Sequence, residues 1–170
     1  MKREGHRSLR NLLGWRCATC GELITRIEDG WVEWLAGEDE RANTKIKGLH
    51  LVHDHQASPR PQKEHGCQYD ERREFRTDRS IVEGLSLERF VGPDGLMLLL
   101  SFLAAGEMPK DAVLELTKRV QIPGYEQTRE LFDAAIHNGV VKPSISTGYY
   151  LQWEIQALLD EIQSPANPPA

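Results

Sequence analysis

Two cysteines three positions apart, Cys17 and Cys20 in the stretch CATCG, are the residues whose types and spacing most clearly indicate chemistry. Thiolates at positions i and i+3 of a tight turn can both reach one metal ion at about 2.3 Å. The glycine that follows, Gly21, tolerates the backbone conformations that such a turn requires. The pair therefore predicts half of a tetrahedral zinc site.

A tetrahedral site needs two further ligands, and few residues can supply them. Cys67 is the only other cysteine in the chain. His53 closes a strand-like segment and is the preferred fourth ligand, while His55 lies two residues later on the same face of an extended chain and is its substitute. The predicted site is a Cys3His set, in which four protein ligands leave no open position for catalysis: Cys17, Cys20, His53 and Cys67.

Other assignments of these polar residues remain open on the sequence alone. His50 and His65 could replace His53, and Asp70 could supply a carboxylate ligand. The cysteines could instead be free thiols, or they could form a redox dithiol. A redox pair usually sits at the start of a helix in a βαβ context, whereas strand-like segments flank this pair.

The CATCG stretch resembles the knuckle of zinc-ribbon and treble-clef modules, a resemblance that implies a small β-rich module with a structural zinc. The stretch GLHLVHDHQASPR with the downstream Cys67 is also similar to the core of HNH endonucleases of the endonuclease VII type. That second resemblance implies that Asp54 and a neighbouring histidine hold a divalent ion or activate water. The sequence departs from this pattern because no acidic residue stands immediately before His53, the second cysteine pair is reduced to Cys67 in CQYD, and the asparagine is missing.

Strands are the elements predicted to position these ligands. β-branched and aromatic residues favour strands over three segments, 22–27, 30–36 and 45–52. Asp29-Gly30 between the first two indicates a hairpin turn. Residues 56–80 are rich in charge and contain two prolines, so we expect a long loop that Cys67 would anchor to the knuckle.

Helical periodicity follows in the second half of the chain, with helices expected over 92–107, 108–121, 122–139 and about 148–162. Their order resembles a winged-helix layout, with the stretch GVV at 139–141 entering a strand. A recognition helix normally presents Lys and Arg to phosphates. The helix expected over 122–139 has a net charge of −2 from Glu126, Arg129, Glu130 and Asp133, which favours a protein partner over DNA.

Composition and charge limit the class of protein. The chain of 170 residues has a net charge of −5, all of it in residues 84–170, whereas a dedicated nucleic-acid binder needs a basic surface. The longest apolar run, at 96–105, is much shorter than the roughly 20 residues of a membrane-spanning helix, and no signal peptide is recognisable. We therefore expect a cytoplasmic protein without a membrane segment.

The predicted fold class is α+β, with a small β-rich, zinc-stapled N-terminal module and a C-terminal segment of three to four helices. The predicted function is that of a non-enzymatic interaction or regulatory protein with a structural zinc. The alternatives are a divergent HNH-type nuclease and a winged-helix DNA-binding regulator, and the oligomeric state stays open. The predicted divisions are a basic lead-in, the zinc module, the helical domain and a disordered tail: 1–14, 15–80, 84–163 and 164–170.

Overall fold

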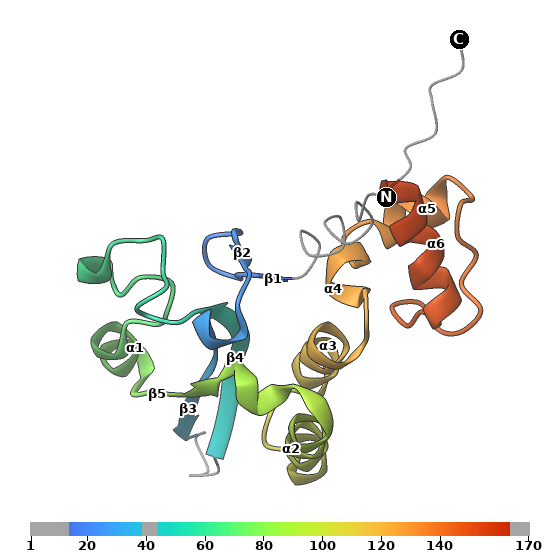
Figure 1. Ribbon diagram of the computed structural model, residues 1–170. Coiled ribbons are helices and arrows are strands. Elements are labelled where there is room, and N and C mark those ends of the chain that lie inside the picture. The colour runs from blue at the N-terminus through green and yellow to red at the C-terminus, as the bar shows by residue number, and fades with distance from the viewer. Residues whose placement is uncertain (1–13, 39–43, 164–170) are drawn as a thin grey trace. The chain divides into compact units, whose positions relative to one another are not determined.

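A computed structural model describes residues 14–38 and 44–163 of the protein. The chain forms two compact units that divide between Gln121 and Ile122. Antiparallel sheets come first and helices dominate the remainder, so the predicted α+β class is confirmed (Figure 1). The tail predicted over 164–170 and nearly all of the predicted lead-in lie outside the described residues.

The N-terminal unit contains two antiparallel sheets. A small sheet pairs β1 (Trp15–Arg16) with β2 (Leu23–Ile24). The larger sheet has the strand order β4-β3-β5, with the long β3 in its centre. Its strands are β3 (Gly30–Glu38), β4 (Thr44–His53) and β5 (Ile81–Ser86).

The strands predicted over 30–36 and 45–52 are confirmed as β3 and β4, but the hairpin predicted at Asp29-Gly30 is wrong. A 3-10 turn over Ile27–Asp29 leads into β3, and the short β2 before it pairs with β1 instead. β5 was not expected from the sequence, because its six residues adjoin a highly charged segment. A local turn signal thus cannot identify which strand pairs with which.

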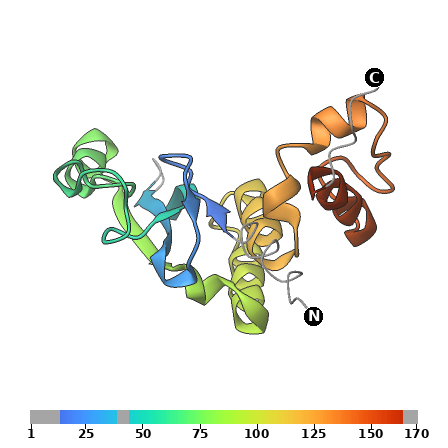
Figure 2. The ribbon, with the colours of Figure 1, turned by 45° about the horizontal axis from the view of Figure 1, so that its top comes forward.

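Helices α2 (Gly92–Ala105) and α3 (Lys110–Gln121) pack against each other on the larger sheet (Figures 1 and 2). The rings of Trp34 from β3 and Phe102 of α2 meet in a T-shaped arrangement with centroids 5.8 Å apart. The shared core also contains Val32, Leu51, Leu99, Val113 and Leu116. These contacts group α2 and α3 with the sheet, whereas the domain predicted over 84–163 placed them with the later helices.

No helix within the described residues is long and apolar enough to cross a membrane.

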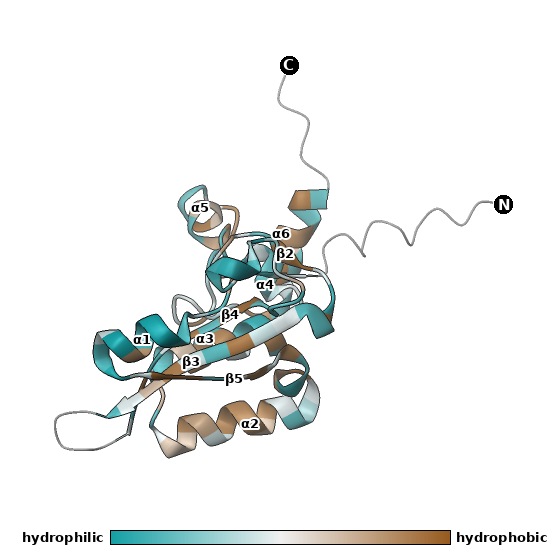
Figure 3. Cartoon of the chain, turned by 90° about the vertical axis from the view of Figure 1, so that its left-hand side faces the viewer, coloured by the Kyte–Doolittle hydropathy of each residue, from teal (hydrophilic) through white to brown (hydrophobic). Residues whose placement is uncertain are grey.

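Helix α1 (Glu71–Asp78) lies inside the segment that was predicted to be a loop over 56–80, so that prediction is wrong for these eight residues. The carboxylate of Asp70 caps the helix by accepting the Arg73 N–H at 3.0 Å. The Lys47 ammonium on β4 pairs with Asp78 at the other end of the helix. Because α1 buries none of its residues, it lacks the apolar periodicity that reveals a helix (Figure 3).

The C-terminal unit contains α4 (Tyr125–Thr128), α5 (Phe132–His137) and α6 (Gln152–Gln163). The single helix predicted over 122–139 is therefore interrupted after Thr128, where the Leu131 N–H turns back to the Thr128 carbonyl at 2.9 Å. The strand predicted at 139–141 does not form, since Val141 packs into the helical core. That core consists mainly of Tyr125, Phe132, Ala135, Val141, Ile155 and Leu158.

Glu154 of α6 is fully buried and stabilises the C-terminal unit. Its carboxylate accepts the backbone N–H groups of Ser144 at 2.8 Å and Leu151 at 2.6 Å. Glu154→Ala leaves both donors unpaired, and we expect a loss of about 2–4 kcal/mol of local stability. Hydrogen exchange of residues 122–163 measures this loss. Glu161→Ala, an exposed change on the same helix, should cost less than about 0.5 kcal/mol, and equal losses would contradict the assignment.

Candidate metal centre

The turn between β1 and β2 holds Cys17 and Cys20 in place. The Cys17 N–H donates to the Glu22 carbonyl at 2.9 Å, and the Gly21 N–H donates to the Cys17 carbonyl at 3.0 Å. Gly21 has a positive φ of 79°, a conformation that glycine adopts without strain. The Ala18 N–H donates to the Leu51 carbonyl of β4 at 2.9 Å. The knuckle therefore lies against the end of β4.

The other two predicted ligands are a nitrogen from His53 in β4 and a sulfur from Cys67 in the segment that follows β4. His53 is the last residue of β4, and both His53 and Cys67 are buried. The Thr19 hydroxyl of the knuckle donates to the Cys67 carbonyl at 2.6 Å, and the Ser58 hydroxyl donates to the Cys67 sulfur at 3.2 Å. These hydrogen bonds place Cys67 beside the knuckle despite the length of the connecting segment.

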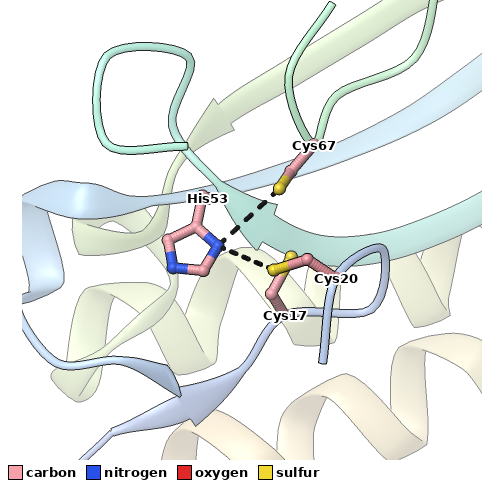
Figure 4. Close-up of side chains that lie close together, drawn as sticks. All are labelled: Cys17, Cys20, His53 and Cys67. Carbon is pink, nitrogen blue, oxygen red and sulfur yellow. Dashed lines mark hydrogen bonds between the residues drawn. The ribbon is translucent and has the colours of Figure 1, made fainter. Parts of the chain in front are cut away.

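The four predicted ligands converge on one point (Figure 4). Nδ1 of His53 lies 3.5 Å from the Cys20 sulfur and 3.8 Å from the Cys67 sulfur. All four ligand atoms of Cys17, Cys20, His53 and Cys67 lie within 4.8 Å of one another. Tetrahedral zinc with ordinary Zn–S and Zn–N bonds requires separations of roughly 3.5–3.8 Å. The cluster is thus compatible with a bound metal ion such as zinc.

The three thiols are unbridged, and the pKa values of Cys17 and Cys20 are shifted in opposite directions. Burial alone would raise the pKa of Cys17, but hydrogen bonds from the backbone N–H groups of Cys20 and Thr19 and from His53 outweigh burial and lower this pKa to about 7. Burial, together with the neighbouring Cys17 and Cys67 sulfurs, raises the pKa of Cys20 to about 12 despite the backbone N–H of Glu22, which lowers it. Neighbouring thiolates repel one another, so several thiols in one cluster do not readily ionise together. A bound divalent cation offsets this repulsion.

The other histidines named in the sequence analysis lie elsewhere. His55 is exposed and does not belong to the cluster. Nε2 of His50 pairs with Glu33 at 2.7 Å, and Nε2 of His65 lies 3.2 Å from a carboxylate oxygen of Asp70. The direction of the chain at the end of β4 therefore distinguishes His53 from its neighbours.

The arrangement implied by the HNH resemblance also differs from the geometry of this cluster. One carboxylate oxygen of Asp54 accepts the Gln56 N–H at 3.0 Å in a local turn. The adjacent His53 directs Nδ1 at two cysteine sulfurs. Asp54 thus belongs to a turn and His53 to the sulfur cluster, so the two side chains do not form the pair that the HNH resemblance implies.

A second polar group, centred on Glu33, was not expected from the sequence. Glu33 is only 1% exposed, and its Oε1 accepts from Nε2 of His50 at 2.7 Å and from the Tyr69 N–H at 2.8 Å. The Tyr69 ring stacks on His50, with centroids 4.3 Å apart, and its hydroxyl donates to the Gly48 carbonyl at 2.9 Å. The sequence feature that could have indicated this group is a charged residue between Val32 and Trp34 in a strand. Because side chains alternate along a strand, Glu33 points to the face of the sheet opposite the helices.

Comparisons of the chain with protein-family models, curated proteins and solved structures find no match. The four converging ligands and the Glu33 group are therefore the observations on which a function can be argued.

Proposed function

We propose that this chain is a zinc-binding protein with a structural zinc, and that it acts as an interaction or regulatory module rather than as an enzyme. The zinc would be held by Cys17, Cys20, His53 and Cys67. The observation that carries the proposal is the convergence of these four side chains, three of them buried, from three separate segments.

The ligand types support zinc over other common ions. Three sulfurs and one imidazole nitrogen form the soft, tetrahedral donor set that zinc prefers, whereas Mg²⁺ and Ca²⁺ require oxygen ligands. Four protein ligands complete the tetrahedron, so that no position remains for water or a substrate. This closed coordination supports a structural role.

The segment between β4 and α1 explains what the zinc would stabilise. Of residues 54–70, only Gly66 and Cys67 are buried. A segment with so little packing gains little from the hydrophobic effect, and the binding energy of a structural metal is available as folding energy. The zinc would therefore join this segment, the knuckle and the end of β4 into one unit.

The surface of the C-terminal unit supports a protein partner. Trp153 is 59% exposed, and Leu131 and Leu151 are also exposed. Exposed aromatic and aliphatic side chains of this size are common in protein interfaces. The acidic charge of the second half of the chain disfavours nucleic acid as the partner.

Metal analysis of the full chain, purified without added zinc, tests the proposal. We expect about one zinc per chain. Replacement by Co²⁺ should give the absorption spectrum of tetrahedral cobalt with thiolate ligands, and added azide should leave that spectrum unchanged because the coordination is closed. Absence of bound metal would contradict the zinc site. Azide binding would contradict the structural role alone, because it would reveal an open position.

A further inference from the structure

A pocket of about 430 Å³ lies beside the metal centre, on the side of the sheet that carries the Glu33 group. Its walls come from the turn between β1 and β2, from β4, from the segment after β4 and from the start of α1. They include Thr19, His50, Arg60, Lys63, Tyr69 and Arg73. The volume is within the range of small-molecule sites, about 300–1,000 Å³, and exceeds that of a single inorganic anion.

Three cationic side chains face this pocket. Arg60 and Lys63 are exposed, and within residues 14–38 and 44–163 neither side chain has a hydrogen-bond acceptor or an ion-pair partner. The Arg73 guanidinium pairs with Glu74 at 2.9 Å. Of the two acidic residues in the wall, Asp70 is engaged by the Arg73 N–H and by His65, whereas the exposed Glu64 has no side-chain partner in the described parts of the chain. Two unpaired cations, Arg60 and Lys63, thus face one unpaired carboxylate, Glu64, which leaves a positive excess at the pocket in a chain whose net charge is −5.

The Glu33 group gives the pocket a rigid wall. Glu33 holds Nε2 of His50, so the ring has one remaining nitrogen, Nδ1, which has no partner in the described parts of the chain. The stacked Tyr69 ring and its hydrogen bond to Gly48 prevent the imidazole from turning. A ligand would therefore meet an oriented imidazole and an aromatic ring in the wall that also carries the cationic side chains.

We propose that this pocket binds a small organic phosphate, with Arg60 and Lys63 contacting the phosphate group and Nδ1 of His50 contacting the ligand. Guanidinium and ammonium groups are the usual ligands of phosphate oxygens. The remaining volume and the His50–Tyr69 wall suit an organic group about the size of a nucleoside. This inference concerns a second site and does not depend on the closed coordination of the zinc.

Calorimetric titration of the full chain with adenosine monophosphate at low ionic strength tests the inference. We expect saturable binding, which Arg60→Ala/Lys63→Ala weakens by at least about tenfold because two charge-assisted contacts are lost. The control Lys45→Ala/Arg89→Ala removes the same charge at exposed positions outside the pocket and should change the affinity by less than about twofold. In the wild-type chain, the His50 ring resonances should shift on addition of adenosine monophosphate.

Four outcomes would overturn the inference. The first is the absence of saturable binding together with unchanged His50 resonances. The second is equal weakening by the two double variants, which would show unspecific attraction between charges. The third is adenosine binding as tightly as its monophosphate, and the fourth is citrate doing so, because either result would remove the phosphate from recognition. If a variant fails to fold, the wild-type chain alone tests the inference: a shift of the His50 ring resonances on addition of adenosine monophosphate supports it, and unchanged resonances overturn it.

Discussion

Cys67→Ser is expected to abolish zinc binding and to unfold the N-terminal unit. A serine hydroxyl stays protonated at neutral pH and is a poor zinc ligand, so the segment between β4 and α1 loses its attachment. Structural zinc sites in small peptides contribute about 10–16 kcal/mol, which matches or exceeds the total stability of many domains, about 5–15 kcal/mol. Zinc content and hydrogen exchange, compared between residues 14–121 and 122–163, measure the two effects.

Two histidine variants serve as a matched comparison for this prediction. His53→Ala removes a ligand and should behave like Cys67→Ser, while His55→Ala changes an exposed histidine two residues away and should keep one zinc per chain. Removal of zinc from the wild type with a chelator should reproduce the loss of protection in the N-terminal unit. A Cys67→Ser variant with one zinc and wild-type stability would contradict the assignment of Cys67.

Glu33→Ala is expected to lower the free energy of unfolding by about 3–5 kcal/mol. The change leaves the Tyr69 N–H without its acceptor, frees the His50 imidazole and opens a small cavity beneath the pocket. Urea unfolding of the zinc-loaded protein measures the loss. Zinc content should stay near one per chain, because Glu33 is not one of the four converging ligands.

The control for this variant is Glu83→Ala on the neighbouring strand β5. Glu83 is exposed and accepts one hydrogen bond, from Nε1 of Trp34 at 2.9 Å. Its removal exposes the indole donor to water, so we expect a loss below about 1 kcal/mol. Equal losses in the two variants would show that burial of Glu33 does not make its hydrogen bonds more important than those at the surface.

The composition of the Cys3His cluster and two of the strands were predictable from the sequence. Cys17 and Cys20 are three residues apart, and that spacing determines a ligand pair without any knowledge of distant contacts. Cys67 followed because the chain has no further cysteine. β3 and β4 were predictable because their β-branched and aromatic residues have a strong intrinsic preference for extended backbone.

Only the tertiary structure decided between His53 and His55, because the choice depends on where the knuckle meets the end of β4. The pairing of Glu33 with His50 likewise depends on strand register, which places these residues opposite each other and which the sequence does not state. Helix α1 and strand β5 escaped prediction because none of their residues is buried. Local preference and ligand chemistry are properties of short segments, whereas register and burial exist only once distant segments have come together.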